Sequence, residues 1–366
     1  MRKILAVVWV LLMAGVGNVR AADENLMAFV GAVEQSYIEP LPIADLAKAA
    51  FKGLQDMDPK VRIADDKTRF TFYYDAKVYR NFNKPEGENS REWVELIDRV
   101  FKAAVKISAP ISLRDYEAPD AMMSRMVEAL DKDSKFYRAM DMADNSALKA
   151  RRNFASRRIG DILYVRVGVF DINTSKQMSE LMAQEKGAKA MILDLRGNSG
   201  GQLEAAAQVA GLFLDGGMVF MTRGRGAEAN MVYSAEAKGD FDGKPVAILT
   251  DGETASAAEL MAGSLQEQNR ALLLGTETFG KRTTQRLVSL PNGSVFGLTN
   301  AYVYLPSGES LAEGGVRPDY CLSGKKGTAE AIAAVAEPGK GGCARENRKL
   351  RDEDVEAAVE LLKTRI

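Results

Sequence analysis

A serine and a lysine are the two side chains of this sequence whose spacing suggests hydrolytic chemistry. Ser256 lies in the run Thr-Ala-Ser-Ala-Ala-Glu at residues 254–259, and Lys281 follows 25 positions later. The 366 residues include no histidine, so a serine nucleophile here would have no imidazole to take its proton. A lysine amine is the alternative base, and it accepts a proton only when burial keeps it uncharged. The composition therefore excludes the histidine-dependent serine hydrolases.

Two interpretations of Ser256 are open on local sequence. A serine followed three residues later by Glu259 is the capping-box pattern of a helix N-terminus, which requires no catalytic role. A helix N-terminus also presents free amides and positive potential to an anion, so the same position suits a nucleophile that generates an oxyanion. Local sequence alone favours the capping interpretation.

A glycine-rich run lies upstream of Ser256. Residues 197–201 (Gly-Asn-Ser-Gly-Gly) fit the Gly-x-Ser-x-Gly pattern of a nucleophile elbow. That mechanism requires a histidine base, so Ser199 is not predicted to be a nucleophile. Glycines leave backbone amides unobstructed, and such amides can point at a developing oxyanion. We therefore expect this run to serve as an oxyanion loop.

A second glycine-rich run contains Lys281. Residues 275–281 (Gly-Thr-Glu-Thr-Phe-Gly-Lys) fit most of a phosphate-binding loop. Arg282 stands where that motif requires the Ser or Thr that contacts magnesium. Residues 283–290, followed by Pro-Asn-Gly, predict a strand and a turn, whereas a phosphate loop requires a helix N-terminus there. We therefore expect no nucleotide at this run.

The segments that must position these motifs alternate between two periodicities after residue 157. Short apolar runs bounded by glycine or charge predict strands, and stretches of 3.6-residue periodicity predict helices. The strands are expected at 162–170, 190–195, 218–221, 246–250 and 271–274, and the helices at 203–214 and 257–268. This alternation predicts an α/β core with a largely parallel sheet, in which sites form where strands end and helices begin. All three motifs lie at such junctions.

The first half of the chain has a different pattern. Apolar residues recur there at helical spacing, in stripes at 26–33, 46–54, 93–101 and 122–130. Residues 62–82, which are rich in Phe and Tyr, are compatible with helix or strand. We expect a mainly helical domain whose stripes form a core or a homo-oligomer interface.

The N-terminus predicts export. A basic start is followed by an apolar stretch over residues 4–16 and by small residues at 21 and 22, where a signal peptidase would cut. The apolar stretch is shorter than the roughly 20 residues that span a bilayer. We therefore expect a cleaved signal peptide and a periplasmic protein; the alternative is an uncleaved N-terminal anchor. Its removal takes away Arg2, Lys3 and Arg20 and changes the formal net charge from -1 to -4, which gives no indication of nucleic-acid binding.

Cys321 and Cys343 are the only cysteines. In an oxidising compartment such a pair can form a disulfide that ties the C-terminal segment to the core. The alternative is two unpaired thiols. Both stay open, because the Cα separation that decides between them is not contained in a sequence.

Five ordered runs together resemble the carboxyl-terminal processing (tail-specific) proteases. They are Asp-Leu-Arg with the glycine-rich run at 194–201, and the runs at 254–260, 279–285, 304–308 and 315–319. In that family the serine and the lysine are 25 positions apart and a glutamine follows four positions later, as Ser256, Lys281 and Gln285 do here. The resemblance covers about residues 157–320.

The resemblance implies a serine-lysine protease with a crotonase-like or ClpP-like α/β core. By position, Ser256 would attack the peptide carbonyl, Lys281 would act as base and then as acid, and Gln285 would orient the lysine amine. The amides of Gly201 and Ala257 would form the oxyanion hole. The pKa of Lys281 would have to fall from about 10.4 to near 7, which costs about 4 kcal/mol. No metal or other cofactor is implied.

One departure from the family concerns substrate capture. Members of the family usually carry a PDZ domain before the core, whereas about twenty residues, 138–158, separate the N-terminal helices from the first core strand here. We therefore predict a PDZ-less member. Its expected parts are a signal peptide at 1–22, a helical domain at 23–145, a protease core at 146–336 and a C-terminal segment with a terminal helix at 337–366.

Two functional hypotheses follow. The first is a periplasmic serine endopeptidase that cuts unstructured or C-terminal segments of exported proteins, for which the partner is a protein or peptide substrate. The second, motivated by the missing PDZ domain, is a catalytically silent or partner-activated member that acts as a protein-binding module and depends on an activating or adaptor protein. The chain retains the serine, the lysine and the glutamine together, which favours the first.

Overall fold

The computed structural model describes residues 24–140, 154–239, 241, 243–311, 314–335, 343–349 and 351–366. The expected signal peptide lies outside these residues. Two compact units divide the chain. The N-terminal unit comprises 1–149 and 285–300, and the core unit comprises 150–284 and 301–366. A stretch from the second half of the sequence therefore belongs to the first unit.

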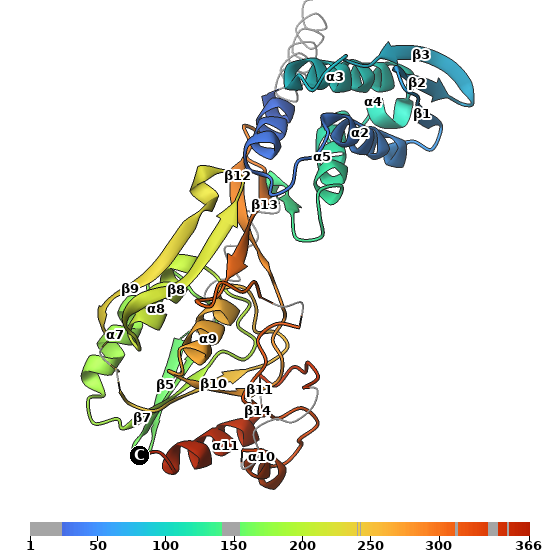
Figure 1. Cartoon of the computed structure of the whole chain (residues 1–366). Helices are drawn as coiled ribbons and strands as arrows, with labels where there is room; N and C mark the ends of the chain where they lie inside the picture. The colour runs from blue at the N-terminus through green and yellow to red at the C-terminus, as the bar shows by residue number, and fades with distance from the viewer. Residues whose placement is uncertain are drawn as a thin grey trace, which may run out of the picture. The chain divides into compact units, whose positions relative to one another are not determined.

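The N-terminal unit contains the helices that the apolar stripes predict (Figure 1). Its helices are 24–36, α2 (Ile43–Met57), α3 (Ser90–Ile107), α4 (Ala109–Ser112) and α5 (Ala118–Glu128). The start of α3 is capped by the Asn89 side chain, which accepts from the amides of Arg91 and Glu92. In this unit β4 (Lys135–Tyr137) pairs with the first part of β13 (Val295–Tyr304).

The ambiguous region 62–82 forms a three-stranded antiparallel sheet. Its strands are β1 (Val61–Asp65), β2 (Arg69–Tyr74) and β3 (Lys77–Asn83), in that order. Phe70 and Phe72 alternate along β2 and are both buried in the core of the N-terminal unit. Burial at every second residue, rather than the aromatic content, distinguishes a strand from a helix in this region. The N-terminal unit is thus mainly, but not wholly, helical.

The core unit is built on a six-stranded sheet. Its strands, from one edge to the other, are β14 (Tyr320–Cys321), β11 (Leu272–Gly275), β10 (Val246–Thr250), β7 (Ala190–Asp194), β6 (Ile162–Val167) and β5 (Phe154–Ile159). Neighbours are parallel except β5 and β6, which confirms the expected largely parallel sheet. Every residue of β7 and β10 is buried, as expected of strands covered on both faces.

Helices cover both faces of this sheet (Figure 1). One face packs against α7 (Thr174–Gln184), α8 (Leu203–Gly211) and α9 (Ala257–Glu267), and the other against α10 (Thr328–Ala334) and α11 (Asp352–Lys363). A second sheet contains β8 (Asp215–Gly224), β9 (Met231–Lys238), β12 (Thr283–Ser289) and β13, and a 3₁₀ turn, η2 (Ala227–Ala229), joins β8 to β9. Strand β8 is longer than the predicted 218–221.

Three loops leave the sheet at the carboxyl ends of adjacent strands. Register pairs Asp194 at the end of β7 with Leu249 of β10, and Thr250 at the end of β10 with Gly275 of β11. The three loops that follow are the oxyanion loop (197–201), the nucleophile turn (251–256) and the lysine turn (276–281). Because parallel strands end at one edge, the fold brings together the three motifs that the sequence separates.

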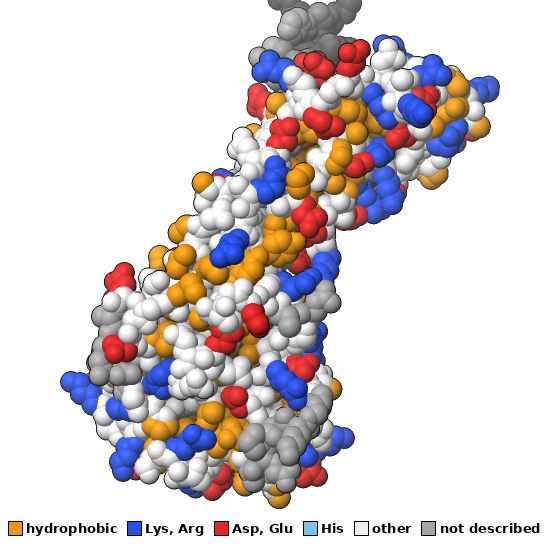
Figure 2. Space-filling model, in the orientation of Figure 1, with side chains coloured by type: hydrophobic (Ala, Val, Ile, Leu, Met, Phe, Trp, Pro, Cys, Tyr) orange, Lys and Arg blue, Asp and Glu red, His pale blue; other side chains and the backbone are white. Residues whose placement is uncertain are grey.

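No helix among the described residues is long and apolar enough to cross a membrane. On the face drawn in Figure 2, basic and acidic side chains are interspersed, without a continuous area of one sign. This surface agrees with the near-neutral formal charge of the sequence.

Candidate active site

Ser256 occupies a strained turn at the start of α9. Its φ of 57° and ψ of -125° are unusual for a residue with a side chain, and such strain concentrates at functional sites. Ser256 is half-buried, whereas the helix that follows is buried from Ala257 to Leu265. A simple helix cap normally has an extended backbone, so the backbone of Ser256 is closer to that of a nucleophile elbow.

The oxyanion loop packs directly against Ser256. A Cβ added to Gly200 would lie 2.8 Å from Ser256 Cβ and 3.0 Å from the Ala257 amide nitrogen. The Gly200 amide donates to Asn198 Oδ1 at 2.8 Å. Within the described part of the chain, neither the Gly201 nor the Ala257 amide has a hydrogen-bond acceptor. Both amides are therefore available to an oxyanion.

Asn198 holds the oxyanion loop in place, a role that sequence reasoning missed. Its side chain is fully buried, and Nδ2 donates to the carbonyl of Val167 at 3.0 Å. Its backbone carbonyl accepts from the Ala255 amide at 2.9 Å. One residue thus joins the end of β6, the glycine loop and the residue before Ser256. Ser199, its neighbour, is exposed.

The lysine turn is attached to the nucleophile turn through its backbone. The Phe279 amide donates to the carbonyl of Thr254 at 2.9 Å. Thr278 accepts on Oγ1 from the Val316 amide at 2.7 Å. Lys281 follows and is half-buried. Strand β12 begins at Thr283, which confirms the strand expected after Lys281; a phosphate-binding loop would have a helix there.

A single buried carboxylate, that of Glu259, joins the two turns. Its Oε2 accepts from the amide of Ser256 at 2.8 Å and from the amide of Lys281 at 3.0 Å. Its Oε1 accepts from the Gly280 amide and the Thr278 hydroxyl, at 2.6 and 2.5 Å. Two chain positions 25 residues apart therefore donate to the same oxygen atom. Burial raises the pKa of the Glu259 carboxyl, and these donors act in the opposite direction.

Sequence reasoning identified Glu259 only as a capping partner of Ser256. The glutamate half of that capping box is present, because the Ser256 amide donates to Oε2. The hydrogen bonds to Gly280 and Lys281 were missed, because the capping-box pattern covers only four consecutive residues and gives no information on distant ones. The signal that could have found them is the burial of a charged residue on the first turn of an otherwise apolar helix.

Replacing Glu259 with glutamine should lower kcat by about 10- to 100-fold. The NH₂ group of glutamine cannot accept a hydrogen bond, so one of the two pairs of donors loses its acceptor. The turn that carries these donors must then shift relative to the other turn. Steady-state kinetics on a peptide substrate measures the loss, and circular dichroism checks folding. The control is Glu180→Gln, an exposed carboxylate on α7. A kcat within twofold of the wild type would show that Glu259 does not align the turns.

A buried ion pair supports the start of the oxyanion loop. The Arg196 guanidinium donates to both carboxylate oxygens of Asp194, at 2.9 and 2.7 Å. Tyr164 also donates to Asp194, at 2.7 Å. Burial acts to raise the pKa of Asp194, but the hydrogen bonds and charge of Arg196 outweigh burial and hold that pKa below its usual range. Asp194 therefore stays ionised and fixes the chain direction before Gly197.

Gln285 lies in β12 and is half-buried. When the chain is divided into its two compact units, Gln285 belongs to the N-terminal unit, whereas Ser256 and Lys281 belong to the core unit. Its predicted role in orienting the lysine amine stays a prediction.

Cys321 and Cys343 form a disulfide, with their Cα atoms 5.7 Å apart. No cluster of potential metal ligands occurs among the residues that the structure describes.

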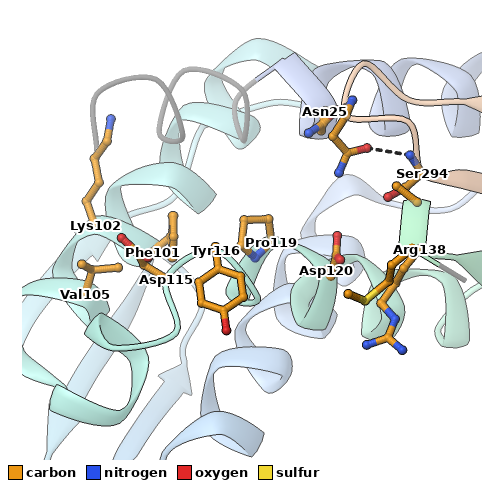
Figure 3. Close-up of a pocket in the computed structure, with 13 residues that line it drawn as sticks. Asn25, Phe101, Lys102, Val105, Asp115, Tyr116, Pro119, Asp120, Arg138 and Ser294 are labelled. Atoms are coloured by element: carbon orange, nitrogen blue, oxygen red, sulfur yellow. Dashed lines mark hydrogen bonds between the residues drawn. The ribbon is translucent and has the colours of Figure 1, made fainter. Parts of the chain in front are cut away.

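A pocket of about 380 Å³ lies in the N-terminal unit (Figure 3). Its lining combines aromatic and aliphatic side chains with charges of both signs: Phe101, Lys102, Val105, Asp115, Tyr116, Asp120, Arg138 and Met140. None of the predicted catalytic residues lines it. Two basic and two acidic side chains give the pocket no preference for one charge class.

Comparison with known proteins gives consistent matches in the core unit. The sequence model of peptidase family S41 matches residues 161–322. A carboxy-terminal-processing protease of Bartonella bacilliformis is 38% identical over 169 residues, which are 44% of this chain and 38% of that protein. A carboxyl-terminal-processing protease of Synechocystis is 35% identical over 159 residues, which are 43% of this chain and 36% of that protein. The match thus spans less than two fifths of these relatives.

Among solved structures, a photosystem II D1 C-terminal processing protease is 32% identical. The match covers 43% of this chain and 41% of that chain, with a TM-score of 0.39.

Proposed function

We propose that this chain, whose residues 161–322 match peptidase family S41 and which is similar to carboxy-terminal-processing proteases, is a serine endopeptidase with Ser256 as nucleophile and Lys281 as base. The observation that carries the proposal is the Glu259 carboxylate, one oxygen of which accepts from the amides of both residues. An arrangement that fixes two distant turns to one atom serves a pair of side chains that must meet.

The proposed reaction begins at the Ser256 hydroxyl. Neutral Lys281 takes its proton while Oγ attacks the peptide carbonyl, and the oxyanion accepts from the amides of Gly201 and Ala257. Protonated Lys281 then gives its proton to the leaving amine, which leaves an acyl group on Ser256. Water hydrolyses that ester with Lys281 again as base. Gln285 is proposed to orient the lysine amine.

The proposed substrates are unstructured or C-terminal segments of exported proteins with small or apolar residues near the scissile bond. The similarity to carboxy-terminal-processing proteases supports this class of substrate. The basic and apolar start of the sequence supports a periplasmic location. The interval of about twenty residues between 138 and 158 supports the proposal of a PDZ-less member. We propose that recruitment depends on the N-terminal unit or on an adaptor protein.

An assay of cleavage of a disordered protein such as casein tests the proposal. The full chain is expected to produce discrete fragments, identified by mass spectrometry, and to leave a folded protein of similar size intact. Ser199→Ala is a matched control, because its hydroxyl is exposed and no base is assigned to it. Loss of cleavage in this variant would contradict the assignment of the nucleophile. Cleavage that occurs only with a cellular extract would support the partner-activated alternative.

A further inference from the structure

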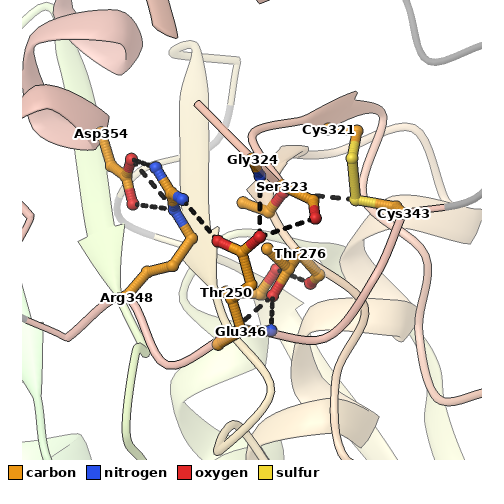
Figure 4. The surroundings of a disulfide bond; sticks show 10 residues. Thr250, Thr276, Cys321, Ser323, Gly324, Cys343, Glu346, Arg348 and Asp354 are labelled. Atoms are coloured by element: carbon orange, nitrogen blue, oxygen red, sulfur yellow. Dashed lines mark hydrogen bonds and ion pairs between the residues drawn. A yellow bond between two sulfur atoms is a disulfide. The ribbon is translucent and has the colours of Figure 1, made fainter. Parts of the chain in front are cut away.

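A short C-terminal segment runs from the disulfide past Thr276 to Arg348, which faces Asp354 (Figure 4). We call residues 343–349 the C-terminal strap. The strap begins at the disulfide cysteine Cys343 and precedes α11, and it lies beyond residue 322, where the match to family S41 ends. The matched range therefore does not include the strap, although it includes the loops that the strap contacts.

The strap is bonded to the nucleophile turn at two points. The Gly252 amide donates to the carbonyl of Glu346 at 2.8 Å. The Arg348 amide donates to Asp251 Oδ2 at 3.0 Å. Both bonds lie within five residues of Ser256, so the strap fixes the approach of the chain to the nucleophile.

Asp251 transmits this contact to the oxyanion loop. Its side chain is fully buried, and Oδ1 accepts from the amide of Gly197 at 2.9 Å and from that of Thr254 at 3.1 Å. The other oxygen accepts from the strap at Arg348. One carboxylate therefore connects the strap, the first glycine of the oxyanion loop and the nucleophile turn.

The strap also contacts the start of the lysine turn. Thr276 is fully buried, and its hydroxyl lies 3.3 Å from both the amide nitrogen and the carbonyl oxygen of Glu346. All three loops of the proposed site thus meet the strap or its carboxylate partner.

Two devices hold the strap itself. The Arg348 guanidinium is fully buried and donates to both oxygens of Asp354 in α11, at 2.9 and 2.6 Å, and to Glu346 at 2.9 Å. At the other end, the disulfide ties Cys343 to Cys321 at the sheet edge, beside Gly275 of β11. The ion pair is a fixed attachment, whereas the disulfide can be removed by a reductant.

We infer that the C-terminal strap positions the oxyanion loop and the nucleophile turn, and that the disulfide Cys321–Cys343 makes this positioning depend on redox state. The inference rests on the proposed peptidase function. A dithiol reductant supplies two electrons and two protons, the disulfide becomes two thiols, and the dithiol becomes a disulfide. The strap then retains Arg348 but is no longer held at Cys343, and the Gly252 and Gly197 amides lose a fixed partner.

The first test compares kinetics of the full chain in three forms: oxidised, reduced with dithiothreitol, and as the double variant Cys321→Ala/Cys343→Ala. Reduced and variant proteins should show a kcat about 10- to 100-fold lower at unchanged KM. A peptide aldehyde, whose adduct with Ser256 places an oxyanion in the hole, should bind more weakly by the same factor. A merely structural role would instead lower the number of titratable active sites and leave kcat per site unchanged, and that result overturns the inference.

Glu360→Gln, which removes an exposed ion pair with Lys363 on α11, is the matched control and should change neither constant. Unchanged kcat on reduction would also overturn the inference. Dithiothreitol should have no effect on the double variant, because the bond it acts on is already missing.

The second test does not depend on turnover, and so separates this inference from the proposed function. Amide hydrogen exchange, followed by mass spectrometry, should become faster on reduction in peptides covering 197–201 and 251–256. Faster exchange confined to peptides covering 321–349 would mean that the strap does not brace the loops. If the oxidised chain cleaves nothing, the peptidase proposal fails, while the exchange result still decides whether the strap holds these loops.

Discussion

Replacing Ser256 with alanine is expected to lower kcat on a disordered substrate by about 10⁴-fold or more, because the acyl-enzyme route is lost and only binding and the oxyanion hole remain. Lys281→Ala should be as severe, and the double variant no worse than either single one, since the two side chains act as a unit. Lys281→Arg is the sharper test. It keeps a cation on a long stem, but a guanidinium does not give up its proton.

Single-turnover kinetics on a peptide ester and on the corresponding amide measure these losses. The amide should show the larger one, because its leaving group needs the proton that Lys281 delivers. Lys176→Arg on α7, at an exposed position, is the control and should be fully active. Activity of Lys281→Arg above about 1% of the wild type would show that Lys281 is not the base.

The second large effect is expected at Gly200. An alanine there would place Cβ 2.8 Å from Ser256 Cβ and 2.9 Å from the Ala255 carbonyl oxygen, at a φ of +105°. The oxyanion loop must then move away from the nucleophile, and the amide of Gly201 moves with it. Loss of one oxyanion donor costs about 10²- to 10³-fold in kcat, so a loss of that size is expected with little change in KM.

Gly217→Ala separates the effect of contact from that of backbone strain. Gly217 in β8 has a similar φ of +91°, but nothing lies within 4 Å of an added Cβ. Both variants should lose about 1–2 kcal/mol of stability in chemical denaturation because of the positive φ. Gly200→Ala should lose more, because its Cβ also meets close neighbours, and it alone should lose activity. Equal kcat values for the two would mean that the oxyanion loop is not where the transition state is stabilised.

The sequence was informative wherever the signal was local. The buried strands β7 and β10 are continuous apolar runs, and the helices α8 and α9 have the expected period, so the core sheet and the three loops at its edge could be predicted. The strand β12 after Lys281 followed from its turn residues. These features depend on residues that are close in the chain, and the periodicity of apolar residues indicates such local structure directly.

The features that were missed depend on contacts between distant segments. The sequence identified Glu259 only as a helix cap, because its hydrogen bonds to Gly280 and Lys281 join residues that are 21 and 22 positions apart. The strap was expected only as a C-terminal segment, since nothing in the run around Arg348 shows that it faces Asp251. The β1–β3 sheet stayed open because Phe and Tyr suit a helix face and a strand equally well until burial of Phe70 and Phe72 fixes the period.

The N-terminal unit is assembled from two stretches of chain, 1–149 and 285–300. Phe296 and Leu298 belong to its core, and the ring of Phe296 lies 4.8 Å from that of Phe29. A chain that emerges into its compartment with its N-terminus first cannot complete this core when residue 149 has emerged. It has to wait until the nucleophile turn and the lysine turn have also been synthesised. A nascent chain that stalls before residue 285 would expose an unfinished apolar core to chaperones and proteases, although the residues that begin that core were made first.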